Sequence, residues 1–518
     1  MSRSRSGPVA RTAALAAALL LVGACAVGPN YVRPSVATPA DYKESQGWAA
    51  AQPRDDASRG AWWEVFGDPQ LSALEAEVTA ANQNVAVAEA QLRQARALVR
   101  QARAAYFPQV TLGVGVTRSR APALSSSGSS GTSGTSGTTT TSITSGGTGG
   151  STSGAGRGSG QAVTTFTLPL EVSWEPDLWG RVRRSVESNQ AGAQASAADL
   201  ANVALSLQAE LASDYFQLRS LDAQKKLLDD TVAYYQRSLQ LTRNRYDAGV
   251  ASRVDVRQAE TQLTSTQAQA IDLGVQRAQL EHAVATLVGR PASNLSLAFA
   301  PLAAIPPALP VGLPSALLER RPDVAGAERR VAAANAQIGV AKSAYFPVVT
   351  LAASFGFEST SFGDWLTWPS RFWAVGPSVS QLVFDGGLRR AQTDQARAAH
   401  EATVATYRQT VLTAFQEVED NVAALRILEQ EALAQDAAVR AALDAVALVT
   451  NQYRAGTVSY LEVVVAQATA LANQRTAVEI AGRRMAAAVL LVKALGGGWS
   501  ASDLPTAKQV TTREPSQP

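Results

Sequence analysis

Apolar and polar residues alternate along two pairs of short segments in this chain. In residues 109–117, valine and leucine occupy every second position, with threonine and glycine between them. The same alternation occurs in residues 165–174, recurs in residues 349–357 and, less regularly, continues in residues 373–379. A period of two predicts strands with one apolar face. Each predicted strand has about 9 to 11 residues, a length that suits a tilted transmembrane strand.

Long segments with little or no glycine or proline accompany these strands and predict helices. Residues 71–106 contain neither, residues 185–245 contain one glycine, and residues 388–454 again contain neither. The last segment alone would extend about 100 Å as a helix, at 1.5 Å per residue. A second proline-free segment follows each long one, at residues 252–288 and 457–495. Because helices of this length need partners along their length, each pair is expected to form an antiparallel hairpin.

The turns of the two hairpins share a short signature. Gly249 and Gly456 can adopt the left-handed conformation that ends a helix. In each turn a serine stands three residues before an acid, the spacing of a capping box that starts the returning helix. The capping pairs are Ser252 with Asp255 and Ser459 with Glu462. The predicted hairpin tips consist of Tyr246, Gly249, Ser252, Asp255, Tyr453, Gly456, Ser459 and Glu462.

The two halves of the chain repeat each other. Residues 104–112 read Ala-Ala-Tyr-Phe-Pro-Gln-Val-Thr-Leu, and residues 343–351 read Ser-Ala-Tyr-Phe-Pro-Val-Val-Thr-Leu. The offset is 239 residues here and 207 residues at the hairpin tips, so the first copy holds about 32 additional residues. Residues 124–160, almost entirely serine, glycine and threonine, supply them. With so few apolar side chains, this tract is expected to be a flexible, exposed loop.

The N-terminus has the pattern of an export signal. Arginines are followed by the apolar run Ala13–Val22 and then by small residues. The sequence Leu21-Val22-Gly23-Ala24-Cys25 resembles a bacterial lipoprotein signal, in which the cysteine becomes the lipidated N-terminus. An ordinary signal peptide cut near Ala24, leaving a free thiol, is the alternative.

These features divide the chain into five expected parts. They are a lipoprotein signal peptide (1–24), a lipidated N-terminal segment (25–70), a first repeat (71–300) that includes the loop 119–160, a second repeat (301–499) and a flexible C-terminal tail (500–518).

Composition and charge exclude several classes of protein. A single cysteine excludes a disulfide framework, and two histidines with one cysteine argue against a metal centre. A net charge of +3 over 518 residues provides no nucleic-acid footprint. No phosphate-binding loop is present, and no cofactor is expected. Beyond the leader no run of 18 or more apolar residues occurs, so passage through a membrane would have to be by strands.

Four strands cannot form a closed transmembrane barrel on their own. Unpaired strand edges cost several kcal/mol per backbone group in lipid, which demands a closed barrel. About eight strands are the smallest barrel with a filled interior. Three chains would supply twelve strands, and their helical hairpins would continue the barrel.

Several motifs together resemble one known family. They are the Ala-Tyr-Phe-Pro turns, the Tyr-x-x-Gly tips, residues 27–34 (Val-Gly-Pro-Asn-Tyr-Val-Arg-Pro), Trp62-Trp63, Phe66-Gly67-Asp68-Pro69, Arg321-Pro322-Asp323-Val324, Phe384-Asp385-Gly386-Gly387 and residues 494–499 (Ala-Leu-Gly-Gly-Gly-Trp). With the lipoprotein signal, they resemble the TolC-like outer-membrane factors of the NodT lipoprotein type. The resemblance covers about residues 20 to 499.

The resemblance implies an α+β membrane protein that is not an enzyme. It would be a homotrimer with a twelve-stranded transmembrane barrel, four strands per chain, continued by a helical coiled-coil tunnel in the periplasm. The chain would be the lipid-anchored outer-membrane exit duct of a tripartite multidrug efflux pump, with a periplasmic adaptor and a resistance-nodulation-division transporter as partners. The hairpin tips would form the periplasmic gate and contact the adaptor. Family members often carry a gate acid one or two turns before the tyrosine of the second tip. This chain has Ala447 and Thr450 there, and the possible gate acid, Asp444, lies further back.

Aromatic residues gather at both ends of the predicted strands. Trp365, Trp368, Phe372 and Trp373 surround the loop between the last two strands, and Trp174 and Trp179 lie at the opposite strand end. Amphipathic rings at strand ends fit interfacial girdles; packing under a loop is the alternative. The competing function is a lipid-anchored coiled-coil scaffold or adhesin without a channel.

Overall fold

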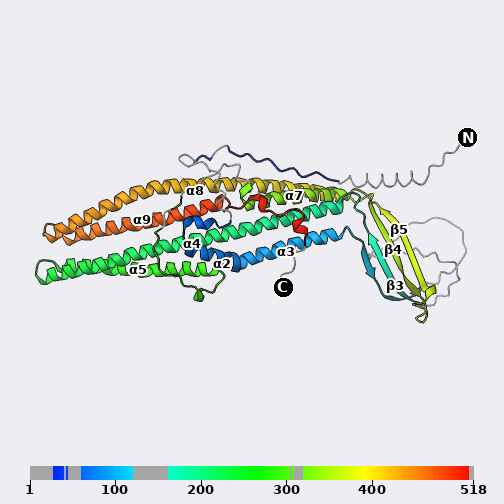
Figure 1. The fold of residues 1–518 in the computed structure, drawn as a ribbon, viewed down its shortest axis with the longest axis horizontal. Coiled ribbons are helices and arrows are strands. Elements are labelled where there is room, and N and C mark those ends of the chain that lie inside the picture. Colours follow the sequence, from blue (N-terminus) through cyan, green and yellow to red (C-terminus); the bar gives the residue numbers. More distant parts are fainter. Residues whose placement is uncertain are drawn as a thin grey trace. The chain divides into compact units, whose positions relative to one another are not determined.

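The computed structural model describes residues 27–39, 42–44, 60–120, 162–303, 306–307 and 319–512. The chain divides into two compact units. A sheet unit comprises residues 104–177 and 345–384, and a helical unit comprises the remainder; Figure 1 labels their elements. Cys25 and most of the loop 119–160 lie outside the described residues.

The sheet unit is an antiparallel sheet with the strand order β1, β3, β4, β5, in which β2 also pairs with β3. The strands are β1 (Gln109–Leu112), β2 (Gly115–Ser119), β3 (Val163–Trp174), β4 (Val348–Ser359) and β5 (Arg371–Ser380). All four predicted strand segments are therefore present, and the first of them is divided into β1 and β2.

The break between β1 and β2 lies opposite a proline. The Gly113 N–H donates to the Pro169 carbonyl oxygen at 2.9 Å. Pro169 has no N–H to donate in return, so the ladder of hydrogen bonds is interrupted. The register is the same on both sides of the interruption. The prediction of one unbroken strand is wrong at this point, although the path of the chain continues.

One face of the sheet is apolar across its middle rows, and the charged Arg118 and Arg371 stand on this face only near one end of the sheet. Paired residues lie on the same face. One row across the strands consists of Leu112, Leu170, Phe355 and Trp373, and the next consists of Val110, Val172, Ala353 and Val375. The opposite face carries the row Thr111, Glu171, Ser354 and Ala374. Leu112 and Trp373, on the two outer strands, are 70% and 78% exposed, so the described residues leave these parts of the apolar face uncovered.

The helical unit contains seven α-helices within the described residues. They are α2 (Pro69–Ala81), α3 (Gln83–Ala104), α4 (Arg181–Asp247), α5 (Arg253–Leu287), α7 (Pro322–Ser343), α8 (Leu388–Arg454) and α9 (Tyr460–Ala494). Short 3-10 helices add η2 (Trp62–Phe66), η3 (Ala292–Asn294), η5 (Ala501–Asp503) and η6 (Gln509–Thr511); η4 (Trp368–Ser370) belongs to the sheet unit.

The two expected helical hairpins are confirmed. The first consists of α4 with 67 residues and α5 with 35, and the second of α8 with 67 and α9 with 35. Within each hairpin the two helices pack together, and α4 also packs against α7 and α9. The hairpins lie side by side in Figure 1. The long helices therefore have the partners that their length requires.

The helix expected over residues 71–106 is divided at Asn82. Its side-chain oxygen accepts hydrogen bonds from the N–H groups of Asn84 and Val85, at 2.8 and 3.4 Å, and so caps α3. Its amide nitrogen donates to the Leu287 carbonyl at the end of α5, at 2.7 Å. The prediction of one helix is wrong because this side chain offers the backbone an alternative partner and a tertiary contact at the same position.

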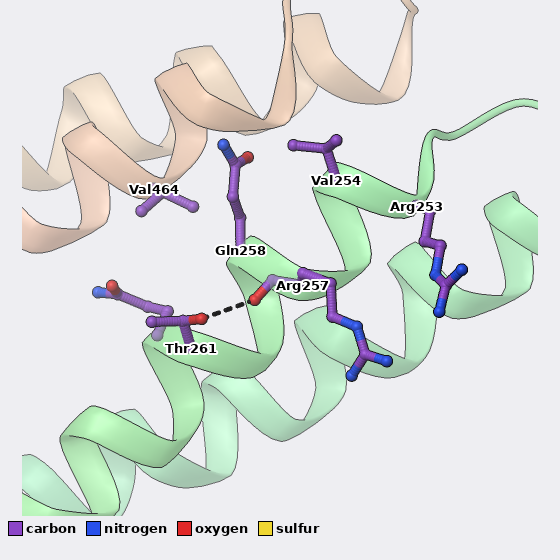
Figure 2. A pocket seen from close by; sticks show the side chains of 7 residues that line it. Arg253, Val254, Arg257, Gln258, Thr261 and Val464 are labelled. Atoms are coloured by element: carbon purple, nitrogen blue, oxygen red, sulfur yellow. Dashed lines mark hydrogen bonds between the residues drawn. The ribbon is translucent and has the colours of Figure 1, made fainter.

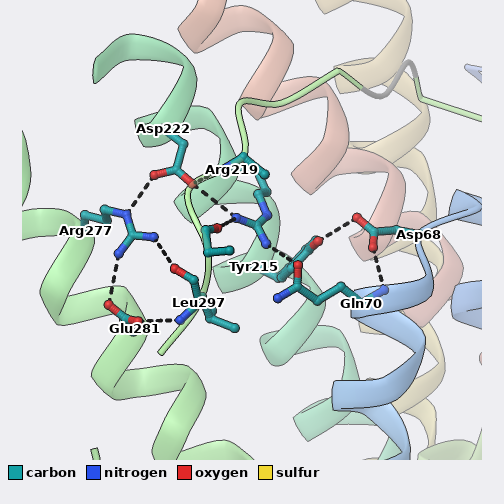
Figure 3. A network of polar contacts seen from close by, with 10 residues as sticks. Asp68, Gln70, Tyr215, Arg219, Asp222, Arg277, Glu281 and Leu297 are labelled. Carbon is teal, nitrogen blue, oxygen red and sulfur yellow. Dashed lines mark hydrogen bonds and ion pairs between the residues drawn. The ribbon is translucent and has the colours of Figure 1, made fainter. Parts of the chain in front are cut away.

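A buried charge network fastens the segment after α5 to the long helices (Figure 3). Asp222, which is 0% exposed, accepts from Arg219 Nη1 at 3.1 Å, from Arg277 Nε at 2.8 Å and from the Ala300 N–H at 3.0 Å. Arg277 also donates to the Leu297 carbonyl at 2.7 Å. The network thereby joins α4, α5 and the connection that leads to the second half of the chain.

The C-terminal residues lie against the helices. Residues 500–512, expected as part of a flexible tail, contain η5 and η6. Val510 is fully buried against Val99 of α3 and Ala193 of α4. Gln194 of α4 donates to the Pro505 carbonyl at 3.0 Å. Residues 513–518 lie outside the described residues.

Candidate functional site at the hairpin tips

The first hairpin tip is closed by its own backbone and one capping box. Gly249 has φ 74°, as expected for the residue that ends α4. Its N–H donates to the Tyr246 carbonyl at 2.9 Å. The Ser252 hydroxyl accepts from the Asp255 N–H at 3.1 Å, and the Asp255 carboxylate accepts from the Ser252 N–H at 3.0 Å. The predicted capping box is confirmed here.

The second tip has the same turn but a different start to its returning helix. Gly456 has φ 79°, and its N–H donates to the Tyr453 carbonyl at 3.0 Å. Ser459 is the N-cap of α9, but its hydroxyl accepts no capping hydrogen bond. The Glu462 N–H donates instead to the Ser459 carbonyl at 3.3 Å. The predicted Ser459–Glu462 capping box is therefore wrong, because the N–H that it requires is directed to a backbone oxygen.

Aromatic contacts hold the two tips together. The rings of Tyr453 and Tyr460 lie 5.2 Å apart, and the guanidinium carbon of Arg245 lies 4.8 Å from the Tyr453 ring centroid. Arg245 Nη1 also donates to the Arg454 carbonyl at 3.2 Å. The Tyr460 hydroxyl lies 3.1 Å from the Ser238 hydroxyl on α4. This inter-hairpin link of Arg245, Tyr453 and Tyr460 connects the first hairpin to the second.

Sequence reasoning identified Tyr453 but missed its partners. Arg245 directly precedes a predicted tip residue and Tyr460 directly follows one, so both stood next to the recognised signature. Their importance comes from contact between the two hairpins, which spacing within one hairpin does not reveal. The equivalent tyrosines also differ, because Tyr453 is 6% exposed and Tyr246 is 45% exposed.

The candidate gate acid lies apart from the tips. Asp444 is exposed on α8, ten residues before the helix ends at Arg454, or about 15 Å along its axis. Within the described residues its carboxylate makes no ion pair or hydrogen bond. The structure does not bring Asp444 together with the predicted tip residues of its own chain.

A groove lies beside the first tip (Figure 2). It has a volume of about 520 Å³ and is lined by Arg253, Val254, Arg257, Gln258, Thr261, Gln262 and Val464. Val254 is 63% exposed, and the Arg257 guanidinium pairs with Glu260 at 2.6 Å. The groove thus presents arginines beside an exposed aliphatic side chain, a combination suited to an amphipathic helix with acidic residues.

A second cavity separates the two hairpins. Its volume is about 540 Å³, and α4, α8 and α9 contribute its walls. Its lining includes Thr450 and Gln467, of which Gln467 is 4% exposed. The side-chain oxygen of each is buried and has no hydrogen-bond partner within the described residues. The contact between the hairpins is therefore less tightly packed here than at the tyrosines of the tips.

The described residues contain no cluster of three or more His, Cys, Asp or Glu side chains that could hold a metal ion. None of the described helices combines the length and apolar character needed to cross a bilayer. The arrangement at the tips consists of turns, helix caps and contacts between helices, which hold the exposed side chains of the two tips in place.

Comparison with known proteins identifies relatives over almost the whole chain. The family model described as outer membrane efflux protein matches residues 74–290 and 313–497. The pyoverdine export outer membrane protein OpmQ of Pseudomonas aeruginosa is 31% identical over 486 residues, which cover 94% of this chain and 96% of that protein. The toluene efflux pump outer membrane protein TtgC of Pseudomonas putida is 30% identical and covers 94% of this chain and 95% of that protein.

Solved structures match the fold over a similar length. The outer-membrane channel OprN superposes with a TM-score of 0.80 at 30% identity and covers 92% of this chain and 100% of that chain. The open state of the Neisseria gonorrhoeae MtrE outer membrane channel gives a TM-score of 0.75 at 26% identity, covering 93% and 100% of the two chains.

Proposed function

The chain belongs to the outer membrane efflux protein family, and we propose that three copies of it form one closed channel through the outer membrane. The family, the efflux function and the outer-membrane location expected from the sequence are confirmed by the relatives. The chain is an outer-membrane exit duct of an efflux system. The solved relatives are outer-membrane channels, which favours the duct over the alternative of a scaffold without a channel. The family is one of channels and not of enzymes.

The apolar face of the sheet is the observation that carries the proposed barrel. The sheet in one chain has two outer edges, formed by β1 with β2 and by β5. Unpaired edge groups are costly in lipid, so edges of neighbouring copies pair with each other. Three copies with four strand positions each supply a barrel of twelve strands. Its apolar face contacts lipid and its polar face, with Thr111 and Glu171, lines the interior.

Aromatic residues support this orientation at the two sheet ends. Trp373 lies at the start of β5 and Trp368 in the preceding turn, and both are more than 70% exposed. Trp174 lies at the end of β3, where it pairs with Leu351 near the start of β4. Together with Trp365, which packs against Phe166, these rings form the interfacial girdles. Phe372 pairs with Gly356 on the polar face of the sheet and is not assigned to a girdle. Trp179 belongs to the helical unit and is not assigned to a girdle.

The helical hairpins form the periplasmic tunnel, and their tips form its gate. The inter-hairpin link of Arg245, Tyr453 and Tyr460 holds the two hairpins of one copy together at this end. The groove beside Val254 accepts a helix of the periplasmic adaptor. Asp444 contributes an acid to the lumen above the tips. A resistance-nodulation-division transporter delivers the cargo.

Cys25 anchors the mature chain through a covalent lipid. This proposal rests on the sequence Leu21-Val22-Gly23-Ala24-Cys25. Replacement by serine is expected to abolish incorporation of labelled fatty acid, and continued incorporation contradicts the anchor.

The duct itself does not select the cargo. Relatives of similar identity are named for pyoverdine export and for toluene efflux, which are chemically unlike solutes. A shared duct architecture over such different cargo is expected if selection occurs in the transporter.

The channel is tested by assembly and conductance together. The full-length protein, purified in detergent, is expected to have the mass of three chains by light scattering and to produce discrete conductance steps in planar bilayers. A monomeric protein, or a trimer that never conducts even after disruption of the gate, contradicts the proposal.

A further inference from the structure

A stripe of arginines runs along α3. The helix contains Arg93, Arg96, Arg100 and Arg103, separated by three, four and three residues, and Glu89 is its only acid. Residues three or four apart lie on one side of a helix. Arg93, Arg100 and Arg103 are exposed and form no ion pair within the part of the chain that the structure describes. Arg93, Arg100 and Arg103, the α3 arginine stripe, are therefore a concentrated positive surface in a nearly neutral protein.

The helical packing determines which side of the tunnel wall the stripe occupies. Val99 of α3 and Ala193 of α4 lie in one small core with Val510 of the C-terminal segment. Arg103 lies four residues after Val99 and therefore on the same side of α3, and Arg100 directly follows Val99.

The contact with Val510 places the stripe beside the C-terminal segment. Gln194, which follows Ala193, also donates to the Pro505 carbonyl at 3.0 Å. The stripe and the C-terminal segment thus lie on the same side of α3. In the proposed tunnel that side is the outer one, because a C-terminal segment on the inner side would lie across the lumen.

The stripe is also close to the first strand along the chain. Five residues separate Arg103 from Gln109, the first residue of β1, so their Cα atoms can be at most about 22 Å apart. The Phe107 N–H donates to the Ala104 carbonyl at 3.0 Å, which makes this connection turn rather than extend. Whatever the arrangement of the two units, the chain therefore tethers Arg103, and Arg100 one turn before it, to a strand end that lies at the periplasmic surface of the membrane in the proposed barrel.

We infer that the α3 arginine stripe binds the anionic headgroups of phospholipids in the periplasmic leaflet of the outer membrane. This inference rests on the proposed membrane-spanning function. Guanidinium groups bind phosphate oxygens through two parallel hydrogen bonds. Basic residues next to a membrane-spanning segment strengthen binding to anionic lipid by about fivefold each. The stripe therefore fixes the depth of the channel in the membrane from its periplasmic side.

The experiment compares lipid binding to two matched double variants. Full-length trimer in detergent is incubated with phosphatidylglycerol or phosphatidylcholine, and bound lipid is counted by native mass spectrometry. Wild-type protein is expected to retain phosphatidylglycerol preferentially, and R100Q/R103Q to bind it about 30-fold more weakly. The control R237Q/R440Q removes two exposed arginines from α4 and α8, and should behave like the wild type.

Three results would overturn the inference. Wild-type protein could bind both lipids equally, or the control could lose as much binding as R100Q/R103Q. Alternatively, R100Q/R103Q could keep its lipid and lose only sedimentation with purified peptidoglycan, which would assign the stripe to the cell wall. In all three cases the trimer and its conductance persist. Failure of the wild-type protein to assemble or conduct would instead contradict the proposed channel.

Discussion

A carboxyl group buried in α2 leads to a quantitative prediction about pH. Glu75 is 0% exposed, and neither of its side-chain oxygens has a hydrogen-bond partner in the described residues. Burial raises the pKa of this carboxyl from 4.5 to about 9, because the charged form loses its hydration. At neutral pH the folded protein therefore holds a proton that the unfolded chain releases.

The sign and size of the effect follow from this difference in proton binding. Stability should decrease as the pH rises from 4.5 towards 9, since the folded state binds the additional proton throughout this range. Each pH unit corresponds to 1.36 kcal/mol, so the cost at pH 7 is 1.36 × (7 − 4.5), or about 3 kcal/mol per chain. Glu75→Gln is neutral at every pH and should remove this cost.

The assay compares the unfolding of Glu75→Gln and wild-type protein by circular dichroism between pH 6.5 and 9. The carboxyl of Asp214, whose pKa is raised to about 6 by burial and by Glu210, stays charged over most of this range. The advantage of the variant should grow from about 3 to about 6 kcal/mol over the range. Glu89→Gln, at an exposed position of α3, is the control and should show no such trend. A constant difference between Glu75→Gln and wild type at all pH values would refute the reasoning.

Three further substitutions test other parts of the structure. Asp222→Asn leaves the buried Arg219 without its counter-charge and should lower the free energy of unfolding by about 3 to 5 kcal/mol. Asp229→Asn, in an exposed pair with Lys225, should lower it by less than about 1 kcal/mol in the same urea titration. Gly456→Ala should lower the free energy of unfolding by about 1 kcal/mol, because an alanine at φ 79° is strained. Gly192→Ala inside α4 should raise it by a similar amount. Equal shifts of the melting temperature in the two variants would contradict this prediction. Arg245→Met removes the hydrogen bond to the Arg454 carbonyl and the contact with Tyr453, so single-channel conductance should rise, and unchanged conductance would separate this link from the gate.

The sequence was informative about features that depend on local pattern. Alternating residues located the strands, the absence of proline located both hairpins, and Gly249 was placed correctly as a helix end. The Asn82 break was missed because composition alone favours helix there, while the contact that stabilises the break comes from Leu287, 205 residues away. Pro169 gave a visible signal, but its effect on the facing strand depends on a register that the sequence does not state.

At the candidate site, too, contacts between residues far apart in the sequence could not be predicted. Spacing identified Tyr453 as a tip residue, yet its environment is formed by Arg245 from the other hairpin. The repeat gives both tips the same signature of tyrosine, glycine, serine and an acid. In the structure, Tyr246 is much more exposed than Tyr453, because only the second tyrosine packs between the hairpins.

This difference between the tips has a functional consequence. The first tip is stabilised by interactions within itself, since Ser252 and Asp255 cap each other. The second tip lacks that box and depends on Tyr453 and Tyr460, whose partners include residues of the first hairpin. A substitution in the first capping box therefore acts on one turn, whereas loss of an aromatic ring at the second tip acts on both hairpins. Residues that control the gate are accordingly expected at the second tip, and a surface that only binds a partner fits the more exposed first tip.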